Sequence, residues 1–427
     1  MKTYYVSIEI NGEQVPVGTI RGADSKDSRF SYNKEYMTTK GSVPISISLP
    51  FMDEQYSPSA TRTYFEGLLP EGFTRRSVAQ IFHKDADDYL GILGKLGREC
   101  IGAVRIGSED DELSCSYSKI SKEQIAALAS SDASKASEYV TKSHLSLAGA
   151  SGKVGLYYDE KNDRWYLPQG IAPSTHIVKQ SHVRLDGIVI NEQLSMMTAR
   201  RLGIDVSDSF IVNTGNGKDS EILFATGRYD RVICEDSEKV DGLALPYRLH
   251  QEDFAQAMGI PPEFKYEAEN EEYAVRMFEL IRSYSSDPIA DQIKLIDRMI
   301  FNCLIGNTDA HIKNFSLLYD AGMKSKSLAP AYDIISTVVY ESSTEDLSFN
   351  IGGIRNIKEI DRDSFVKMAG TVGVGERIVM SEYDELCNSF EQSLHDTAYE
   401  LKEHGFKEAT KLRSKILDNG CVKGMLK

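Results

Sequence analysis

The sequence predicts an α+β fold divided into several compact units, and three features of the chain support this prediction. First, 427 residues are too many for one hydrophobic core. Second, alternation of apolar and polar residues, which is typical of strands, recurs in the first half of the chain. Third, most of the second half has the apolar spacing of helices instead. We therefore expect three units, at residues 1–110, 140–228 and 229–427.

The first unit, residues 1–110, is expected to be small and to combine strands with helices. Strand-like alternation is present at residues 4–10, 15–21 and 42–49. Helical patterns follow around residues 61–69 and 73–82.

The second unit, residues 140–228, starts with a loop of small residues at 146–153. A hairpin, a third strand, a helix and two further strands are then expected. These elements fall at residues 154–159, 165–167, 175–180, 190–202, 209–213 and 221–226. A loop followed by elements in this order is typical of the small lobe of a protein kinase.

The third unit, residues 229–427, is expected to be mainly helical. Residues 291–305 carry apolar side chains at helical spacing and lead into Gly306. Residues 320–322 are turn-prone and indicate a short hairpin. Residues 376–417 indicate two or three surface helices that pack through one face.

Composition and charge argue against several kinds of protein. No stretch approaches the roughly 18 uncharged apolar residues that a membrane helix needs. A net charge of −15 argues against unaided binding of nucleic acid, which requires a basic surface. The six cysteines are scattered, so neither a disulfide framework nor a zinc site is expected. The first residues alternate like a strand and do not resemble a secretory leader, so we expect a cytoplasmic protein.

The strongest chemical pattern is the segment Ile-Gly-Asn-Thr-Asp-Ala-His-Ile-Lys-Asn at residues 305–314. Phosphoryl transfer needs an acidic group that orients the attacking hydroxyl and a nearby oxygen that binds metal. Kinases supply both on one loop with the spacing Asp-x-x-x-x-Asn, which Asp309 and Asn314 reproduce. A polar turn between two elements would have a similar composition, so this pattern alone leaves both interpretations open.

Three further residues occur in the order that kinase chemistry requires. Asp333 follows the expected hairpin, where kinases place the aspartate that binds magnesium, although it could instead cap a helix. Lys179 ends a strand, as does the lysine that contacts ATP phosphates, and Glu192 lies near the start of the next helix, as its partner would. Each of the two could also be simply solvated.

The loop at 146–153 could place backbone N–H groups against phosphates, although an ordinary turn would have the same composition. It matches neither the Walker A pattern nor the Gly-x-Gly-x-x-Gly of most protein kinases. The candidate nucleotide contacts of this segment are Ala148, Gly149, Ala150, Gly152 and Lys153.

Several ordered motifs together resemble the HipA family of serine/threonine kinase toxins. They are Ser-Leu-Ala-Gly-Ala at 146–150, Thr-His-Ile-Val-Lys at 175–179, Asn-Glu at 191–192, Arg-Tyr-Asp-Arg at 228–231, Gly-Asn-Thr-Asp-Ala-His-Ile-Lys-Asn at 306–314 and Leu-Ala-Pro-Ala-Tyr-Asp at 328–333. The likeness extends into the first unit at 68–72, Leu-Leu-Pro-Glu-Gly, and at 96–103, Leu-Gly-Arg-Glu-Cys-Ile-Gly-Ala.

The resemblance implies a two-lobed protein-kinase-like fold with a mostly helical C-terminal lobe and a small mixed N-terminal extension. It implies that Asp309 is the catalytic base, that Asn314 and Asp333 bind magnesium, and that Lys179 contacts ATP. Further implied roles are nucleotide contacts at Glu192, Gly227, Tyr229 and His311 and regulatory phosphorylation at Ser146. This chain departs from the family in two places: Gly227 stands where glutamate is common, and Ser151-Gly152 replaces a version that contains glutamine.

The resemblance also implies ATP and Mg²⁺ as cofactors and a toxin role within a toxin–antitoxin pair. The expected partner is a helix-turn-helix antitoxin, through which any contact with nucleic acid would be indirect. The expected substrate is a protein, for which an aminoacyl-tRNA synthetase is the example that the family offers. Two alternatives stay open, a kinase for small molecules or lipids and a kinase-like scaffold without activity.

Overall fold

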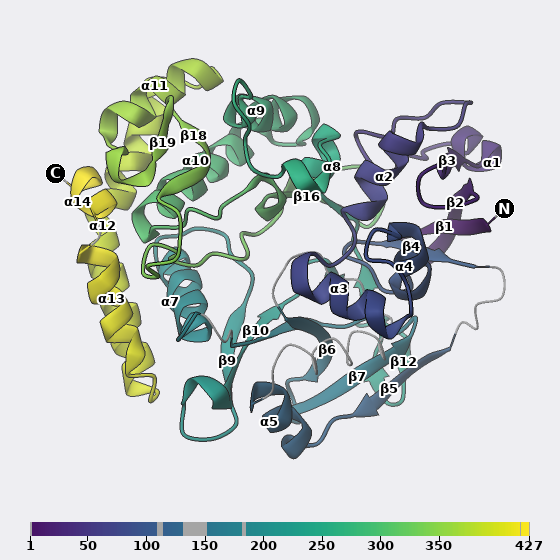
Figure 1. Cartoon of the computed structure of the whole chain (residues 1–427), viewed down its shortest axis with the longest axis horizontal. Coiled ribbons are helices and arrows are strands. Elements are labelled where there is room, and N and C mark those ends of the chain that lie inside the picture. Colours follow the sequence, from purple (N-terminus) through teal and green to yellow (C-terminus); the bar gives the residue numbers. More distant parts are fainter. Residues whose placement is uncertain (1, 109–113, 131–151, 182–184, 419, 427) are drawn as a thin grey trace.

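The computed structural model describes residues 2–108, 114–130, 152–181, 185–418 and 420–426. The N-terminal unit lies on one side, a second sheet lies below it, and the helical region fills the other side (Figure 1). Within these ranges, no helix is long and apolar enough to span a membrane.

The first unit contains a sheet of order β3-β2-β1-β4, formed by β1 (Lys2–Ile10), β2 (Glu13–Gly22), β3 (Arg29–Tyr32) and β4 (Val104–Gly107). Asn11 and Gly12 connect β1 to β2, and both have positive φ angles, 50° and 82°. Asn-Gly is the preferred sequence for this two-residue hairpin turn. The helices of the unit are α1 (Lys34–Thr38), α2 (Pro58–Glu66), α3 (Gly72–Ile81) and α4 (Tyr89–Leu96). The two expected strands and two expected helices at these places are confirmed.

The prediction of a third strand in this unit, at residues 42–49, is wrong. This segment is irregular, and its backbone and side chains bond to distant groups instead of a strand. Ser46 Oγ and Ile47 N donate to the carboxylate of Glu252, at 2.5 Å and 3.1 Å. Ile45 N donates to the hydroxyl of Tyr32 at 3.0 Å. Alternation of apolar and polar residues favours a strand, but it carries no information about which groups form hydrogen bonds with the backbone.

A six-stranded sheet of order β5-β7-β6-β8-β10-β9 forms the second unit (Figure 1). Its strands are β5 (Cys115–Lys119), β6 (Lys153–Asp159), β7 (Arg164–Gly170), β8 (His176–Gln180), β9 (Ser209–Asn213) and β10 (Ile222–Gly227). Helix α7 (Ile188–Arg201) joins β8 to β9, and α5 (Lys122–Ser130) follows β5. The expected hairpin, strands and helix are present. Strand β5 was not predicted; it joins this sheet although it precedes residue 140.

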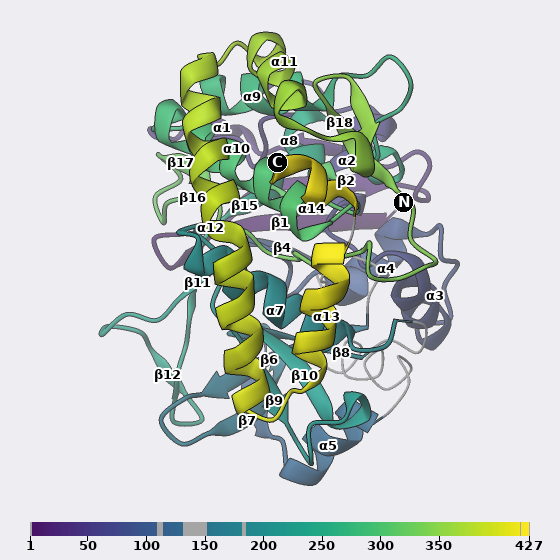
Figure 2. The ribbon, with the colours of Figure 1, turned by 90° about the vertical axis from the view of Figure 1, so that its left-hand side faces the viewer.

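In the remaining chain, helix is the predominant regular structure. Its helices are α8 (Phe254–Met258), α9 (Tyr273–Tyr284), α10 (Pro288–Ile305), α11 (Arg362–Val372), α12 (Glu376–Glu403), α13 (Glu408–Asp418) and α14 (Gly420–Met425). Helices α12 and α13 run side by side along one face of the molecule (Figure 2). Helix α10 starts at Pro288 after the capping aspartate Asp287 and ends at Gly306, whose φ of 78° reverses the chain.

Short strands connect these helices. The hairpin expected around residues 320–322 is formed by β16 (Ser316–Tyr319) and β17 (Lys326–Leu328), and β15 (Gln251–Asp253) pairs with β16. The other pairs are β11 (Arg231–Val232) with β14 (Tyr247–Arg248), β12 (Lys239–Val240) with β13 (Leu243–Ala244), and β18 (Asp346–Ile351) with β19 (Ile354–Asn356).

One hydrophobic core is shared by the first unit and the helical region. It runs without interruption from Val6 in β1 through Phe254 in α8 to Ile300 in α10. A separate cluster lies against the six-stranded sheet, with Leu156, Val178 and Leu223 among its members. The first unit is therefore packed onto the helical region as part of one core, and its position is set by that packing.

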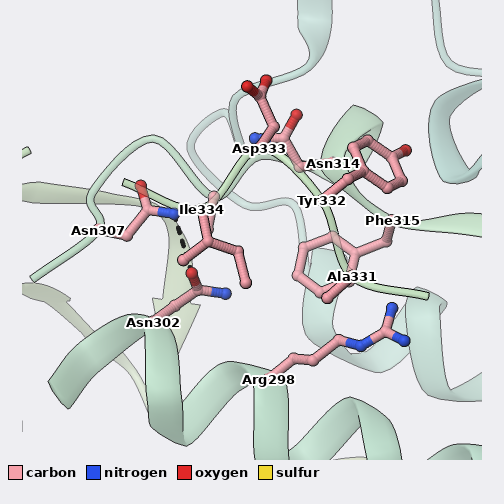
Figure 3. A pocket seen from close by; sticks show the side chains of 10 residues that line it. Arg298, Asn302, Asn307, Asn314, Phe315, Ala331, Tyr332, Asp333 and Ile334 are labelled. Atoms are coloured by element: carbon pink, nitrogen blue, oxygen red, sulfur yellow. Dashed lines mark hydrogen bonds between the residues drawn. The ribbon is translucent and has the colours of Figure 1, made fainter. Parts of the chain in front are cut away.

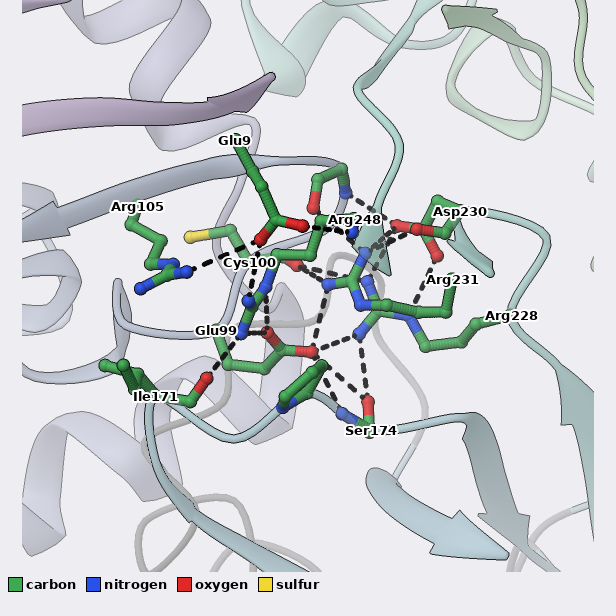
Figure 4. A network of polar contacts seen from close by, with 12 residues as sticks. Glu9, Glu99, Cys100, Arg105, Ile171, Ser174, Arg228, Asp230, Arg231 and Arg248 are labelled. Atoms are coloured by element: carbon green, nitrogen blue, oxygen red, sulfur yellow. Dashed lines mark hydrogen bonds and ion pairs between the residues drawn. The ribbon is translucent and has the colours of Figure 1, made fainter. Parts of the chain in front are cut away.

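A buried ionic network also ties the first unit to the rest of the molecule (Figure 4). The carboxylate of Glu99, 1% exposed, contacts Arg228, Arg231 and Arg248 at 3.0, 2.9 and 2.8 Å. Asp230 pairs with Arg228 at 2.7 Å and accepts a hydrogen bond from Gly102 N at the same distance. Burial by itself would raise the pKa of Glu99, but the three guanidinium groups outweigh it and lower the pKa to about 2.

Glu99→Gln should lower the free energy of unfolding at pH 7 by about 3–5 kcal/mol, because three buried guanidinium groups would lose their shared counter-charge. The folded-state pKa of Glu99 lies below its unfolded value. The contribution is therefore present above about pH 4.5 and is lost as the pH falls toward 2. Urea unfolding followed by circular dichroism measures the effect. The control is Glu408→Gln, which breaks an exposed pair with Lys411 and should change stability by less than about 1 kcal/mol. Equal losses in the two variants would contradict the importance of the buried network.

Candidate active site

The loop at residues 307–314 follows α10 and carries the strongest sequence pattern. Its first residue anchors it, because Asn307 Oδ1 accepts from Asp309 N at 3.1 Å while Asn307 Nδ2 donates to Asn302 Oδ1 at 2.9 Å. Thr308 N donates to the hydroxyl of Thr337 at 2.8 Å. The loop ends in a short 3₁₀ helix, Ile312–Asn314. Side chains rather than a sheet or helix therefore determine the shape of this loop.

Asp309 and Asn314 are close together, as their spacing predicts. Asn314 Nδ2 donates to the backbone oxygen of Asp309 at 3.0 Å, which fixes the orientation of its amide. The carboxylate of Asp309 accepts a hydrogen bond from the hydroxyl of Tyr266 at 2.7 Å. Asp309 is exposed at the surface, yet the protein atoms around its carboxyl group raise the pKa, and the neighbouring Asp333 adds to this effect.

Asp333 lies next to Asn314 on the wall of a pocket below the loop (Figure 3). Its backbone φ is +58°, a left-handed conformation that is uncommon outside glycine, although aspartate adopts it more readily than most residues. The segment that follows is held by Asn191 of α7, which accepts from Ser336 N at 3.0 Å and donates to Ser336 O at 2.8 Å. The surrounding atoms would raise the pKa of Asp333, but the nearby ammonium groups of Lys179 and Lys153 outweigh them and lower it.

Lys179 joins the six-stranded sheet to this wall. Its ammonium group lies 2.6 Å from Glu192 Oε1 and also contacts Asp333 Oδ1. Burial would lower the pKa of Lys179, but the two carboxylates reverse this and raise it. Burial raises the pKa of Glu192 to about 7, and the charge of Asp333 adds to this effect, which Lys179 offsets only in part. The ion pair expected between Lys179 and Glu192 is therefore present, and Asp333 is a third member of it.

Lys153 lies beside Lys179, since the two residues are direct partners across β6 and β8. It is buried, and burial lowers the pKa of its amine to about 8, an effect that the charge of Lys179 reinforces. Gly152 precedes it, and its carbonyl accepts from Gln180 N at 3.4 Å. The other candidates in this segment, Ser146, Ala148, Gly149 and Ala150, lie outside the described residues.

Gly227 and Tyr229 occupy the end of β10 and the connection that follows. Gly227 N donates to Asp208 O at 2.7 Å. A Cβ atom added at Gly227 would lie 3.7 Å from Asp208 O, an ordinary van der Waals distance, so the backbone here leaves room for the first atom of a side chain. The ring of Tyr229 lies 5.7 Å from that of Tyr332, the neighbour of Asp333.

His311 is buried within the loop and faces Tyr266, with the ring centroids 5.4 Å apart. Burial lowers its pKa to about 3, and the charge of Lys265 contributes in the same direction. The imidazole is therefore neutral at physiological pH. Its Nδ1 atom has no hydrogen-bond partner among the described residues.

The structure thus gathers Lys153, Lys179, Glu192, Asp309, His311, Asn314 and Asp333 around one site. It also brings in residues that the sequence did not indicate. Tyr266 contacts Asp309, and Glu71 of the first unit contacts Lys265 and Lys313. Glu71 and Lys313 each lie inside a motif that carried the family resemblance. Their place in these motifs was the only feature of the sequence that could have pointed to the two residues.

The donor atoms at the site suit Mg²⁺ better than metals that prefer nitrogen or sulfur. Among the described residues, no cluster of three or more His, Cys, Asp and Glu side chains could hold a metal. Asp333 offers a carboxylate that is 40% exposed, and Asn314 offers an amide oxygen beside it (Figure 3). Mg²⁺ is commonly held by one or two such groups together with phosphate oxygens and water.

Comparisons with known proteins agree with the resemblance. Residues 145–394 match the HipA-like C-terminal domain family, and residues 8–107 match the HipA N-terminal domain family. The chain is 33% identical over 372 residues to "Putative kinase Y4mE" of Sinorhizobium fredii, with 85% of each chain covered. It is 26% identical over 264 residues to the serine/threonine-protein kinase toxin HipA of Shewanella oneidensis, which covers 59% of this chain and 57% of that one.

A solved structure has the same overall fold. It is a chain in the complex of Shewanella oneidensis HipA, HipB and operator DNA, with a TM-score of 0.77 and 20% sequence identity over 99% of both chains. Likeness at this identity establishes the fold, which is kinase-like with mixed α and β content. The predicted fold class is confirmed at that level.

Lys179→Met should destabilise the protein, and the loss should grow from pH 5 to pH 8. Without Lys179, the carboxyl groups of Glu192 and Asp333 face each other with less positive charge nearby, so their folded-state pKa values rise. A carboxyl group with a higher pKa in the folded state binds more protons when folded, so stability falls as the pH rises between the two values. We expect a loss of about 3 kcal/mol at pH 8. Urea unfolding at both pH values measures it.

The control for this prediction is Lys411→Met, which removes an exposed lysine of α13 and should leave the pH dependence of unfolding unchanged. A loss in Lys179→Met that is the same at pH 5 and pH 8 would contradict the shared ion pair.

Proposed function

Because this chain belongs to the HipA family, we propose that it is an ATP- and Mg²⁺-dependent serine/threonine protein kinase. The observation that carries the proposal is the meeting of Asp309, Asn314 and Asp333 with the Lys179–Glu192 pair. Such a set of residues is the recurring machinery of phosphoryl transfer in protein kinases. A fold without activity would not need all of them at one place.

In the proposed mechanism, Asp309 accepts a hydrogen bond from the substrate hydroxyl and orients it toward the γ-phosphate of ATP. Asp309 is exposed, so the carboxylate lone pairs that do not accept from Tyr266 are accessible to a substrate hydroxyl. The transition state is loose, so positioning and charge stabilisation supply most of the rate enhancement. The raised pKa of Asp309 helps it accept the proton as the new bond forms.

The nucleotide is proposed to lie between the six-stranded sheet and the loop at 307–314. Lys179 and Lys153 would contact its phosphates, and Asp333 and Asn314 would hold Mg²⁺, which neutralises charge on the phosphates when bound. Glu192 keeps Lys179 oriented. Gly227, Tyr229 and His311 would border the nucleotide, and Ala148, Gly149, Ala150 and Gly152 are proposed as further nucleotide contacts.

The three units then correspond to an N-terminal extension at 1–110, a small lobe at 140–228 and a large lobe at 229–427. By analogy with the Shewanella oneidensis protein, which is named a toxin and was solved with HipB and operator DNA, we assign this chain the toxin role of a toxin–antitoxin pair. A helix-turn-helix antitoxin would be its partner and its only link to nucleic acid. The proposed substrate is a cytoplasmic protein of translation, such as an aminoacyl-tRNA synthetase, and phosphorylation of Ser146 would switch the kinase off.

Asp309→Asn and Asp333→Asn should each abolish phosphoryl transfer while leaving the fold intact. The two losses should differ in cause, because Asp333→Asn removes a metal ligand and should weaken Mg-ATP binding, whereas Asp309→Asn should bind Mg-ATP nearly normally. Incubation of purified protein and cell lysate with γ-labelled ATP, together with calorimetry of nucleotide binding, measures both. Asp384→Asn, a change at an exposed aspartate of α12, is the matched control and should behave like wild type.

Labelled protein bands would support a protein kinase, and labelled small molecules would favour a kinase with another substrate. Transfer at the wild-type rate in either active-site variant would refute the assigned site.

Expression of this chain in bacteria without a partner should stop growth, and Asp309→Asn should relieve the arrest. The reason is that growth arrest by a kinase toxin depends on phosphoryl transfer, whereas the burden of producing a folded protein does not. Growth curves at matched protein levels, verified by immunoblot, make the comparison. The same degree of arrest from both versions would argue against a kinase toxin.

A further inference from the structure

Glu71 of the first unit reaches the loop that carries Asp309. It is the residue immediately before α3, a place where a side chain usually accepts hydrogen bonds from the first turn of its own helix. Its carboxylate makes no such cap. Instead, Oε1 lies 2.6 Å from Lys313 Nζ and Oε2 lies 2.8 Å from Lys265 Nζ. Each carboxylate oxygen therefore binds a different lysine, and both lysines belong to the helical region.

Both lysines are adjacent to residues of the proposed site. Lys313 precedes the metal ligand Asn314, and its carbonyl accepts a hydrogen bond from the hydroxyl of Tyr332 at 2.9 Å. Tyr332 precedes Asp333. Lys265 precedes Tyr266, whose hydroxyl donates to Asp309. Glu71 thus binds two lysines, and each lysine is the chain neighbour of a residue of the proposed site, Asn314 or Tyr266.

The contacts of Glu71 are strong because they are sheltered from water. The side chain of Lys313 is only 4% exposed and that of Glu71 is 19% exposed. Burial would raise the pKa of Glu71, but the two lysines outweigh it and lower the pKa to about 2, so the group is ionised. Another carboxylate near Lys313, that of Asp253, lies farther away, at 4.0 Å. Loss of the Glu71 charge would therefore leave a buried ammonium group with weaker compensation.

We propose that Glu71 is a positioning residue for phosphoryl transfer, through which the first unit holds the loop at 307–314 and the segment at 262–267 in their working arrangement. The inference rests on the proposed kinase function. It gives the first unit a part in the reaction itself, since Glu71 aligns Asp309 and Asn314 without contacting nucleotide or substrate. Misplacement of reacting groups by about 1 Å can cost on the order of 100-fold in rate.

Glu71→Gln tests this role, and Glu66→Gln is the matched control. Glu66 belongs to the same unit, is 5% exposed and binds two cations, Arg62 at 2.5 Å and Arg75 at 2.7 Å, but contacts neither Lys265 nor Lys313. Both variants lose a sheltered carboxylate, so both are expected to lose stability. Only Glu71→Gln is expected to lower kcat, by about 10- to 100-fold, with the KM for ATP within about twofold of wild type.

A second measurement does not depend on activity. Hydrogen–deuterium exchange should become faster in residues 262–267 and 309–314 of Glu71→Gln, whereas in Glu66→Gln the faster exchange should be confined to α2 and α3. Faster exchange in both loop segments together with a selective fall in kcat would support the proposal.

Wild-type kcat in Glu71→Gln, an equal fall in kcat in Glu66→Gln, or unchanged exchange in both loop segments would overturn the role of Glu71 alone. Wild-type protein that transfers no phosphate under any condition would remove the proposed kinase function, and with it the role of Glu71 in catalysis.

Discussion

The carboxylate of Glu99 is almost completely removed from water, and such a charge is tolerated only where cations surround it. Arg228 and Arg231 come from the chain just after the six-stranded sheet, and Arg248 comes from β14. Three parts of the molecule must therefore meet at Glu99 before any of these groups is satisfied. This requirement, together with the shared hydrophobic core, holds the first unit against the helical region. The contact of Glu71 with Lys313 is possible only because that position is fixed.

The proposed site has a similar constraint on a smaller scale. Lys179 is shared by Glu192 and Asp333, so one ammonium group links α7, the sheet and the segment after the β16–β17 hairpin. Asp333 is held in a left-handed backbone conformation that favours glycine, and strain of this kind persists only where the surrounding structure enforces it. The hydrogen bonds between Asn191 and Ser336 supply part of that enforcement. The acidic and basic groups are therefore oriented before any ligand arrives.

The sequence pattern predicted an element correctly where local periodicity and capping determine that element. The helix at 291–305 and the strands at 154–159 and 175–180 were predicted to within a few residues, because periodicity and capping act inside each element. The same reasoning failed at residues 42–49. There Ile45 and Leu49 are buried, but so is the polar Ser46, and Glu252 and Tyr32 take the place of a neighbouring strand. Strand β5 was missed because the alternation of Cys115–Lys119 is weak and its partner, β7, lies far along the chain.

For the site, the sequence by itself determined the candidates and their order. The spacing of Asp309 and Asn314 within one loop, a lysine at the end of a strand and an aspartate after a hairpin can all be read along the chain, because each depends on neighbours in sequence. The tertiary structure alone decided that Lys179 serves two carboxylates, that Tyr266 binds Asp309 and that Glu71 reaches Lys313. Such contacts join residues far apart in the chain. They depend on how the units pack, and spacing along a sequence carries no direct record of packing.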